Sequence, residues 1–141
     1  MKKVILAFLL VTSAVISKSQ SVSDDRQATT MLKTFYTAYL SAQDNNVLVG
    51  LQRKYCTPKC EKQIKQLIKS TDSDPVIKGQ DSDPKWAKTL SVKRGAGKPN
   101  TYAVSYYYDE IGDDQKSHKT TVTIKLEVIK VNGAFRVDRI L

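Results

Sequence analysis

Two cysteines are the side chains with the clearest chemical potential in this sequence. Cys56 and Cys60 are its only cysteines, and Pro58 stands between them. Side chains four apart in a regular helix have Cβ atoms about 5–6 Å apart, too far for an unstrained disulfide. Because Pro58 is expected to begin a helix, Cys56 precedes that helix and can fold back over Cys60. Three alternatives remain for the pair. The cysteines form a disulfide that stabilises the fold by about 2 kcal/mol, or they are two buried free thiols. In the third, they take part in redox or copper chemistry, although no histidine or methionine ligand is nearby.

Aspartates recur in the tetrapeptide Asp-Ser-Asp-Pro, which occurs at 72–75 and at 81–84. Carboxylate oxygens are ligands for calcium, and alternating acids resemble the start of a calcium loop. The glycine at the sixth position and the terminal glutamate of such a loop are missing, however. Turn and capping chemistry, in which aspartates accept backbone N–H groups before proline, is therefore favoured, and no metal is predicted.

Tyrosines crowd the segment from Tyr102 to Tyr108. In a strand, Tyr102, Tyr106 and Tyr108 share one face because side chains alternate with period two. Such a stripe of rings with polar tips is suited to gripping a ligand or a partner's surface, with Trp86 as a further aromatic at the rim. Packing in the core and across strands is the alternative.

Catalytic groups are scarce. The only histidine, His118, stands in the polar turn 113–119, where no dry pocket would tune it as a base. No serine, cysteine or lysine lies in a recognisable nucleophile motif. The sequence therefore predicts no catalytic residue.

Three helices are expected in the first half of the mature chain. One begins after Ser23 and ends near residues 44–46, with Ala28, Met31, Leu32, Phe35 and Tyr39 on its apolar face. A second covers Val47–Tyr55, and a third runs from Pro58 to about Lys69 after the N-cap Thr57. Residues 71–88 form a long connection.

Strands follow from Leu90 onward. The expected strands are Leu90–Arg94, Thr101–Asp109, Thr121–Val128 and Ala134–Leu141. The alternation breaks after Val128, which indicates a bulge, and Asn132-Gly133 predicts a type I′ turn. The fold class is therefore α+β: three N-terminal helices packed on a curved four-stranded antiparallel sheet, a cone with a pocket between helix and sheet.

The N-terminal residues resemble a secretory signal. Lys2 and Lys3 precede the uncharged apolar run Val4–Ile16, which small residues follow. The run spans 13 residues, and a membrane-spanning helix needs about 20. We therefore expect residues 1–19 to be a signal peptide, residues 20–141 to be a single domain, and the mature protein to be periplasmic or secreted without stable membrane insertion. A buried amphipathic first helix is the alternative.

The charge of the mature segment does not indicate nucleic-acid binding. After loss of three lysines it has 20 basic and 14 acidic residues, a net charge of +6. The lysines are scattered and alternate with acids, which is typical of a solvated surface.

Several short motifs carry a resemblance to a known family: Tyr55-Cys56-Thr57-Pro58, Asp72 to Pro75, Gln80-Asp81, Trp86 with Thr89-Leu90, and Ala134 to Val137. They resemble the DUF3828 family of small exported bacterial domains of unknown function, grouped with the cystatin-like and NTF2-like cone-shaped folds. The resemblance implies a fold and no activity. Asp74 and Asp81 fall within these motifs, so we expect this pair to hold the long connection through backbone N–H groups.

Our leading hypothesis is an exported, non-enzymatic binding or interaction module. Its ligand would be a small molecule, a peptide or a protein, and no cofactor is predicted. The candidate ligand-binding residues are Tyr102, Tyr106, Tyr108, Trp86, Asp74 and Asp81. The alternatives are a small lyase-like or isomerase-like pocket enzyme that uses a buried Asp and a Tyr, and an inhibitor or immunity-type protein that caps a secreted partner.

Overall fold

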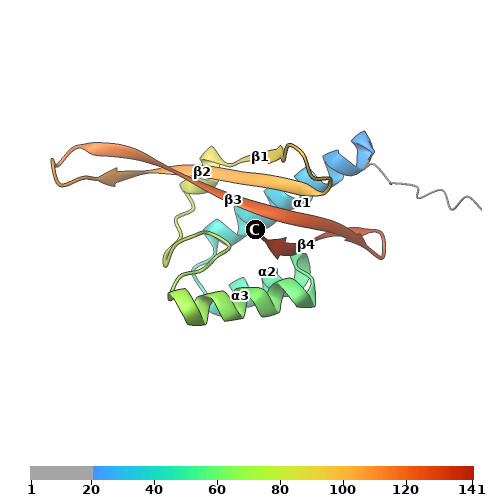
Figure 1. Ribbon diagram of the computed structural model, residues 1–141. Coiled ribbons are helices and arrows are strands. Elements are labelled where there is room, and N and C mark those ends of the chain that lie inside the picture. The colour runs from blue at the N-terminus through green and yellow to red at the C-terminus, as the bar shows by residue number, and fades with distance from the viewer. Residues whose placement is uncertain (1–20) are drawn as a thin grey trace, which may run out of the picture.

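The protein folds as three helices followed by a four-stranded sheet, as seen in a computed structural model that describes residues 21–141 (Figure 1). The helices are α1 (Val22–Ser41), α2 (Asn45–Tyr55), α3 (Pro58–Thr71) and the short 3-10 helix η1 (Trp86–Thr89). The strands are β1 (Ser91–Arg94), β2 (Thr101–Ile111), β3 (Ser117–Val131) and β4 (Ala134–Ile140), all antiparallel in the order β1-β2-β3-β4. The sheet curls without closing, and the predicted α+β class is confirmed.

Side-chain caps fix where the helices begin. The Ser21 hydroxyl accepts the Asp24 N–H at 3.1 Å, so α1 begins two residues before the position expected from Ser23. The Thr57 hydroxyl accepts the Cys60 N–H at 3.2 Å, and Pro58 is the first residue of α3, as predicted.

Two local irregularities shape the sheet as the sequence predicts. Asn132 and Gly133 have φ values of 50° and 82°, which fit a type I′ turn between β3 and β4. The register shifts between Glu127 and Val128, one residue before the expected position.

Strand β3 is longer than its apolar alternation predicts. It begins at Ser117, and the polar run from there to Thr121 pairs with Tyr107–Ile111 of β2. The β2–β3 hairpin therefore projects beyond the helices (Figure 1).

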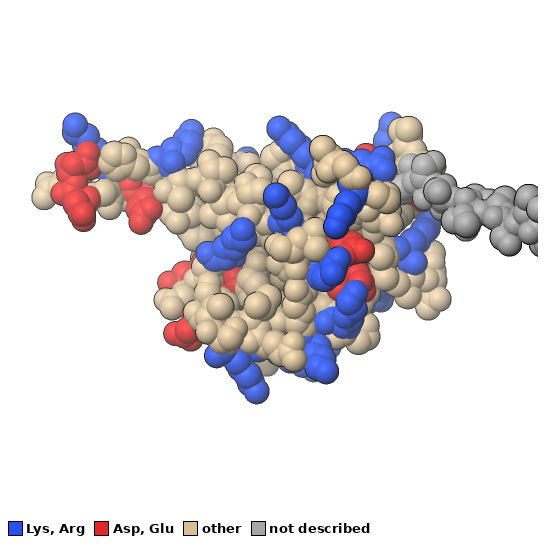
Figure 2. Space-filling view, viewed as in Figure 1, with Lys and Arg blue, Asp and Glu red and all other residues tan. Residues whose placement is uncertain are grey.

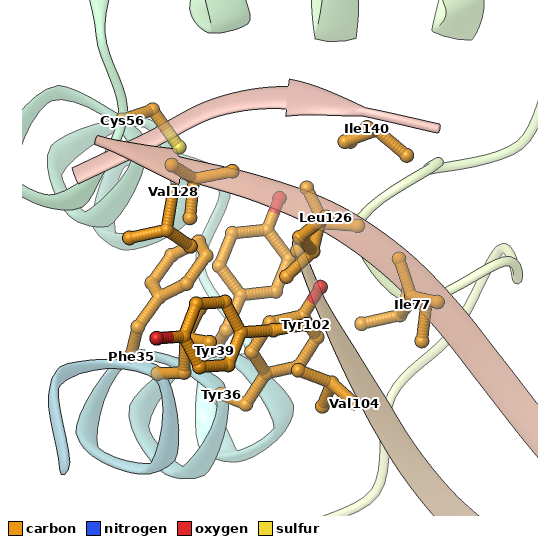
Figure 3. Packing of buried hydrophobic residues seen from close by; sticks show 14 of the residues in the cluster. Phe35, Tyr36, Tyr39, Cys56, Ile77, Tyr102, Val104, Leu126, Val128 and Ile140 are labelled. Carbon is orange, nitrogen blue, oxygen red and sulfur yellow. The ribbon is translucent and has the colours of Figure 1, made fainter. Parts of the chain in front are cut away.

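Aromatic rings fill the space between α1 and the sheet (Figure 3). Phe35, Tyr36 and Tyr39 of α1 are 0–1% exposed, and Tyr102 and Tyr106 of β2 are 1% exposed. Phe35 meets Tyr36 and Tyr39 edge to face, with ring centroids 5.2 and 5.3 Å apart. The expected pocket between helix and sheet is thus occupied by core side chains, because α1 contributes large rings where a cavity would need small ones.

No helix in the part of the chain that the structure describes is long and apolar enough to cross a bilayer. The predicted signal peptide, residues 1–19, lies outside that part.

Candidate functional site

A largely buried carboxylate forms the most connected polar cluster. The Tyr39 hydroxyl donates to Asp74 Oδ2 at 2.6 Å, and the Val76 N–H donates to Asp74 Oδ1 at 2.8 Å. Gln52 Nε2 in turn donates to the Tyr39 hydroxyl oxygen at 2.7 Å. Burial raises the pKa of Asp74, and the hydrogen bonds from Tyr39 and Val76 offset this only in part.

This cluster clamps the segment 72–80 onto the core. The Asp74 N–H donates to the Gly79 carbonyl at 2.9 Å, and the segment inserts Val76 and Ile77, which are 1% and 3% exposed. The Tyr106 hydroxyl donates to the Ile77 carbonyl at 2.5 Å. A catalytic base needs a lone pair directed at its substrate, whereas both Asp74 oxygens already accept hydrogen bonds within the fold. The arrangement therefore serves structure.

The tyrosine stripe lies on the inner face of the sheet. Tyr102 donates its hydroxyl to Asp25 Oδ1 of α1 at 2.8 Å. Burial raises the pKa of Tyr106 to about 12. Trp86 stacks on Tyr106 and Tyr108, with ring centroids 5.6 and 4.9 Å apart, and so covers the outer end of the stripe. Ligand binding by these residues stays a prediction.

The other aspartates of the long connection do not join Asp74. Asp81 is exposed, and within residues 21–141 its side chain accepts no hydrogen bond. Asp83 Oδ1 accepts the Lys85 N–H at 2.8 Å just before η1, and Asp72 ends α3 with φ 51°. Among the described residues, no three histidine, cysteine or acidic side chains are grouped to hold a metal ion.

The two cysteines are free thiols that lie beside each other in the core. They are not joined by a disulfide, so the alternative of buried free thiols describes the structure. The neighbouring Cys60 thiol and burial raise the pKa of Cys56, which disfavours a reactive thiolate. The Tyr36 hydroxyl is also buried, and it finds no hydrogen-bond partner within the described part of the chain.

His118 lies at the exposed base of the hairpin tip rather than in a pocket. Its Nε2 is 2.8 Å from Asp114 Oδ1, and both side chains are largely exposed. The His118 imidazole lowers the pKa of Asp114.

The outer face of the sheet holds a surface that sequence reasoning missed. Two depressions of about 430 and about 280 Å³ lie along β2, and both border on Ala103. Lysines Lys93, Lys98 and Lys125 stand around them. The alternation of β2 predicts which residues face outward, but only the register shows which lysines flank them.

Comparisons with known proteins identify two structures with a similar fold. No family model matches the chain, and no curated protein matches it. A protein of unknown function from Bacteroides thetaiotaomicron VPI-5482 is 29% identical, with 85% of this chain and 95% of that chain covered and a TM-score of 0.70. A chain of the type VI native effector-immunity complex Tae3-Tai3 from Ralstonia pickettii is 14% identical, with 79% and 90% covered and a TM-score of 0.51. The second likeness concerns the fold alone.

Proposed function

We propose that this protein is an exported, non-enzymatic binding module that recognises another protein, as an inhibitor or immunity-type protein does. The observation that carries the proposal is the filled interior. Tyr36, Tyr39, Tyr102 and Tyr106 occupy the space in which a related fold could hold a small molecule, each at 0–1% exposure. Recognition is therefore assigned to the surface of the domain.

The fold likeness to a chain of an effector-immunity complex supports a protein as the partner. Export is a prediction from the signal-like residues 1–19, and membership of the DUF3828 family stays a prediction that implies no activity. Both are compatible with a small secreted or periplasmic domain that caps a partner.

A pocket enzyme is the second candidate, because Asp74 has the features that such an enzyme would use. Its carboxylate is mostly buried, its pKa is raised, and it contacts Tyr39. Against this candidate, the Asp74 oxygens and the Tyr106 hydroxyl already form hydrogen bonds that hold the segment 72–80.

The proposed function is tested by identifying and rebuilding a complex. Tagged residues 20–141 are used to capture proteins from the exported fraction of the source cells, and each candidate is purified and mixed with the domain. We expect a stoichiometric complex with a dissociation constant below about 1 µM by calorimetry. An unrelated basic protein of similar size is the control. Binding of small molecules only, with no rebuilt protein complex, would overturn the proposal.

A further inference from the structure

The register of the sheet places two lysines on either side of a small outward side chain, that of Ala103. Lys93 of β1 and Lys125 of β3 are both paired with Ala103 of β2. Tyr102 and Val104 are buried on the inner face, so Ala103 and both lysines point outward. Neighbouring strands lie about 4.8 Å apart, so the two lysine backbones are roughly 10 Å apart with only a methyl group between them. Ala103 thus forms the floor of a groove, and Lys93 and Lys125 form its two walls.

The groove continues along the outer face of β2. The next row holds Ser105, whose hydroxyl lies 2.9 Å from that of Thr123. Tyr107, the next outward residue of β2, is 38% exposed. The Lys119 ammonium lies over its ring, 4.0 Å from the ring centroid. Ala103 lines both depressions, of about 430 and about 280 Å³, and Lys98 lines the larger one. Small side chains therefore form the floor, hydroxyl groups provide hydrogen bonds, and an aromatic ring forms one end.

The lysines of the groove are not neutralised by their surroundings. Lys93, Lys98 and Lys125 are exposed and take part in none of the ion pairs formed within residues 21–141. The adjacent Arg139, by contrast, is paired with Glu127 at 2.6 Å.

Glu127, which lies two residues from Lys125 on the same face of β3, is paired with Arg139 and does not line the groove. No aspartate or glutamate side chain lines either depression. Figure 2 shows one group of acidic side chains at the tip of the β2–β3 hairpin, and further acidic side chains among lysine and arginine on the body of the domain. A groove lined by charges of one sign raises the local concentration of ligands that carry the opposite charge.

We infer that this lysine groove, defined by Lys93, Lys98, Ala103, Ser105, Tyr107 and Lys125, binds an extended acidic segment of a partner protein. The inference rests on the proposed function and adds the site and the chemistry of the partner. A spacing of roughly 10 Å between the lysine backbones suits one extended chain. Carboxylates of that chain pair with the lysines, and its backbone accepts a hydrogen bond from whichever hydroxyl of the Ser105–Thr123 pair does not donate to the other.

The inference is tested with a fluorescein-labelled glutamate oligomer and two matched triple variants. The groove variant is K93Q/K98Q/K125Q, and the control K62Q/K65Q/K69Q removes the same charge from the exposed face of α3. Fluorescence anisotropy at physiological salt should show that the groove variant binds at least about tenfold more weakly, and the control within about twofold of wild type. Equal losses in both variants would overturn the inference, because net charge alone would then explain binding. Circular dichroism verifies that both variants fold.

Two further measurements distinguish other occupants of the groove. If heparin binds tenfold more tightly than the glutamate oligomer with the same lysine dependence, the occupant is a polysaccharide and the inference fails. If sedimentation shows self-association that D113N/D114N abolishes, the occupant is the hairpin tip of a second copy, and the inference also fails. Absence of both effects supports an acidic protein segment.

The rebuilt complex separates the two proposals. If K93Q/K98Q/K125Q binds the purified partner as wild type does, the groove inference fails and the proposed function stands. If no protein complex can be rebuilt while the oligomer still requires the three lysines, the groove stands as an acidic-peptide site and the proposed function fails.

Discussion

The two faces of the sheet are built from alternate residues of the same strands, yet they have opposite character. On the inner face of β2, Tyr102, Val104 and Tyr106 are 0–1% exposed beneath α1 and η1. On the outer face, Ala103 and Ser105 leave a shallow groove between lysines. The comparison shows that tyrosine content alone does not indicate a binding site, because the side on which a ring lies decides whether it packs or remains available.

The largest expected effect comes from removing an inner ring. Tyr106→Ala should lower the free energy of unfolding by about 3–5 kcal/mol, because the ring is buried, stacks on Trp86 and hydrogen-bonds the Ile77 carbonyl. Urea denaturation measures this. Tyr107→Ala, the adjacent residue on the outer face, is the control and should cost less than about 1 kcal/mol. Equal costs for the two variants would contradict the difference between the faces.

A smaller effect is expected where the segment 72–80 closes the inner side. Asp74→Ala removes the acceptor of the Tyr39 hydroxyl and of the Val76 N–H, and it should cost about 1–3 kcal/mol. Hydrogen exchange should show faster exchange at Val76 and Ile77. Asp81→Ala, at an exposed position of the same connection, should stay within about 0.5 kcal/mol of wild type. If both substitutions lower the free energy of unfolding equally, the hydrogen bonds of Asp74 do not hold the segment 72–80.

The smallest effect concerns the pH dependence of two carboxylates. Burial opposes ionisation of Asp138, but hydrogen bonds from Lys59 and Thr57 outweigh it, so the pKa of Asp138 lies below 3.8. The stability that it contributes, on the order of 1 kcal/mol, is present above its unfolded pKa and is lost as pH falls through the folded value. The pKa of Asp74 is raised, so its contribution has the opposite sign and increases as pH falls from neutral.

Urea unfolding at about pH 3, 5 and 7 checks these signs. The stability difference between wild type and Asp138→Asn should shrink on acidification. The free energy of unfolding of wild type should rise relative to that of Asp74→Asn as the pH falls over the same range. A difference for Asp138→Asn that does not change with pH would show that the carboxylate is not held by Lys59 and Thr57.

Much of the fold could be predicted because its determinants are local. The N-cap Thr57 with Pro58, the Asn132-Gly133 turn and the alternation around Val122–Val128 each act within a few residues. The start of β3 was missed for the same reason. Its residues 117–121 are polar, so no local pattern indicates a strand there. They form a strand because they pair with β2.

The candidate site was less predictable because it depends on distant contacts. Tyr39 and Asp74 are 35 residues apart, and nothing local to either indicates their hydrogen bond. Alternation placed Tyr102 and Tyr106 on one face, but it gave no information on whether α1 would cover that face. The row of Lys93, Ala103 and Lys125 required the register of three strands, which the 95–100 connection and the paired backbones determine together.

The most direct test of the account is a nuclear magnetic resonance titration of the isotope-labelled domain with the glutamate oligomer. We predict that the shifted amides lie along the outer face, centred on Lys93, Ala103 and Lys125, while those of Tyr39, Asp74 and Ile77 stay in place. Shifts centred on Asp74 and the inner tyrosines, with the groove unperturbed, would contradict the account and would place recognition in the interior of the domain.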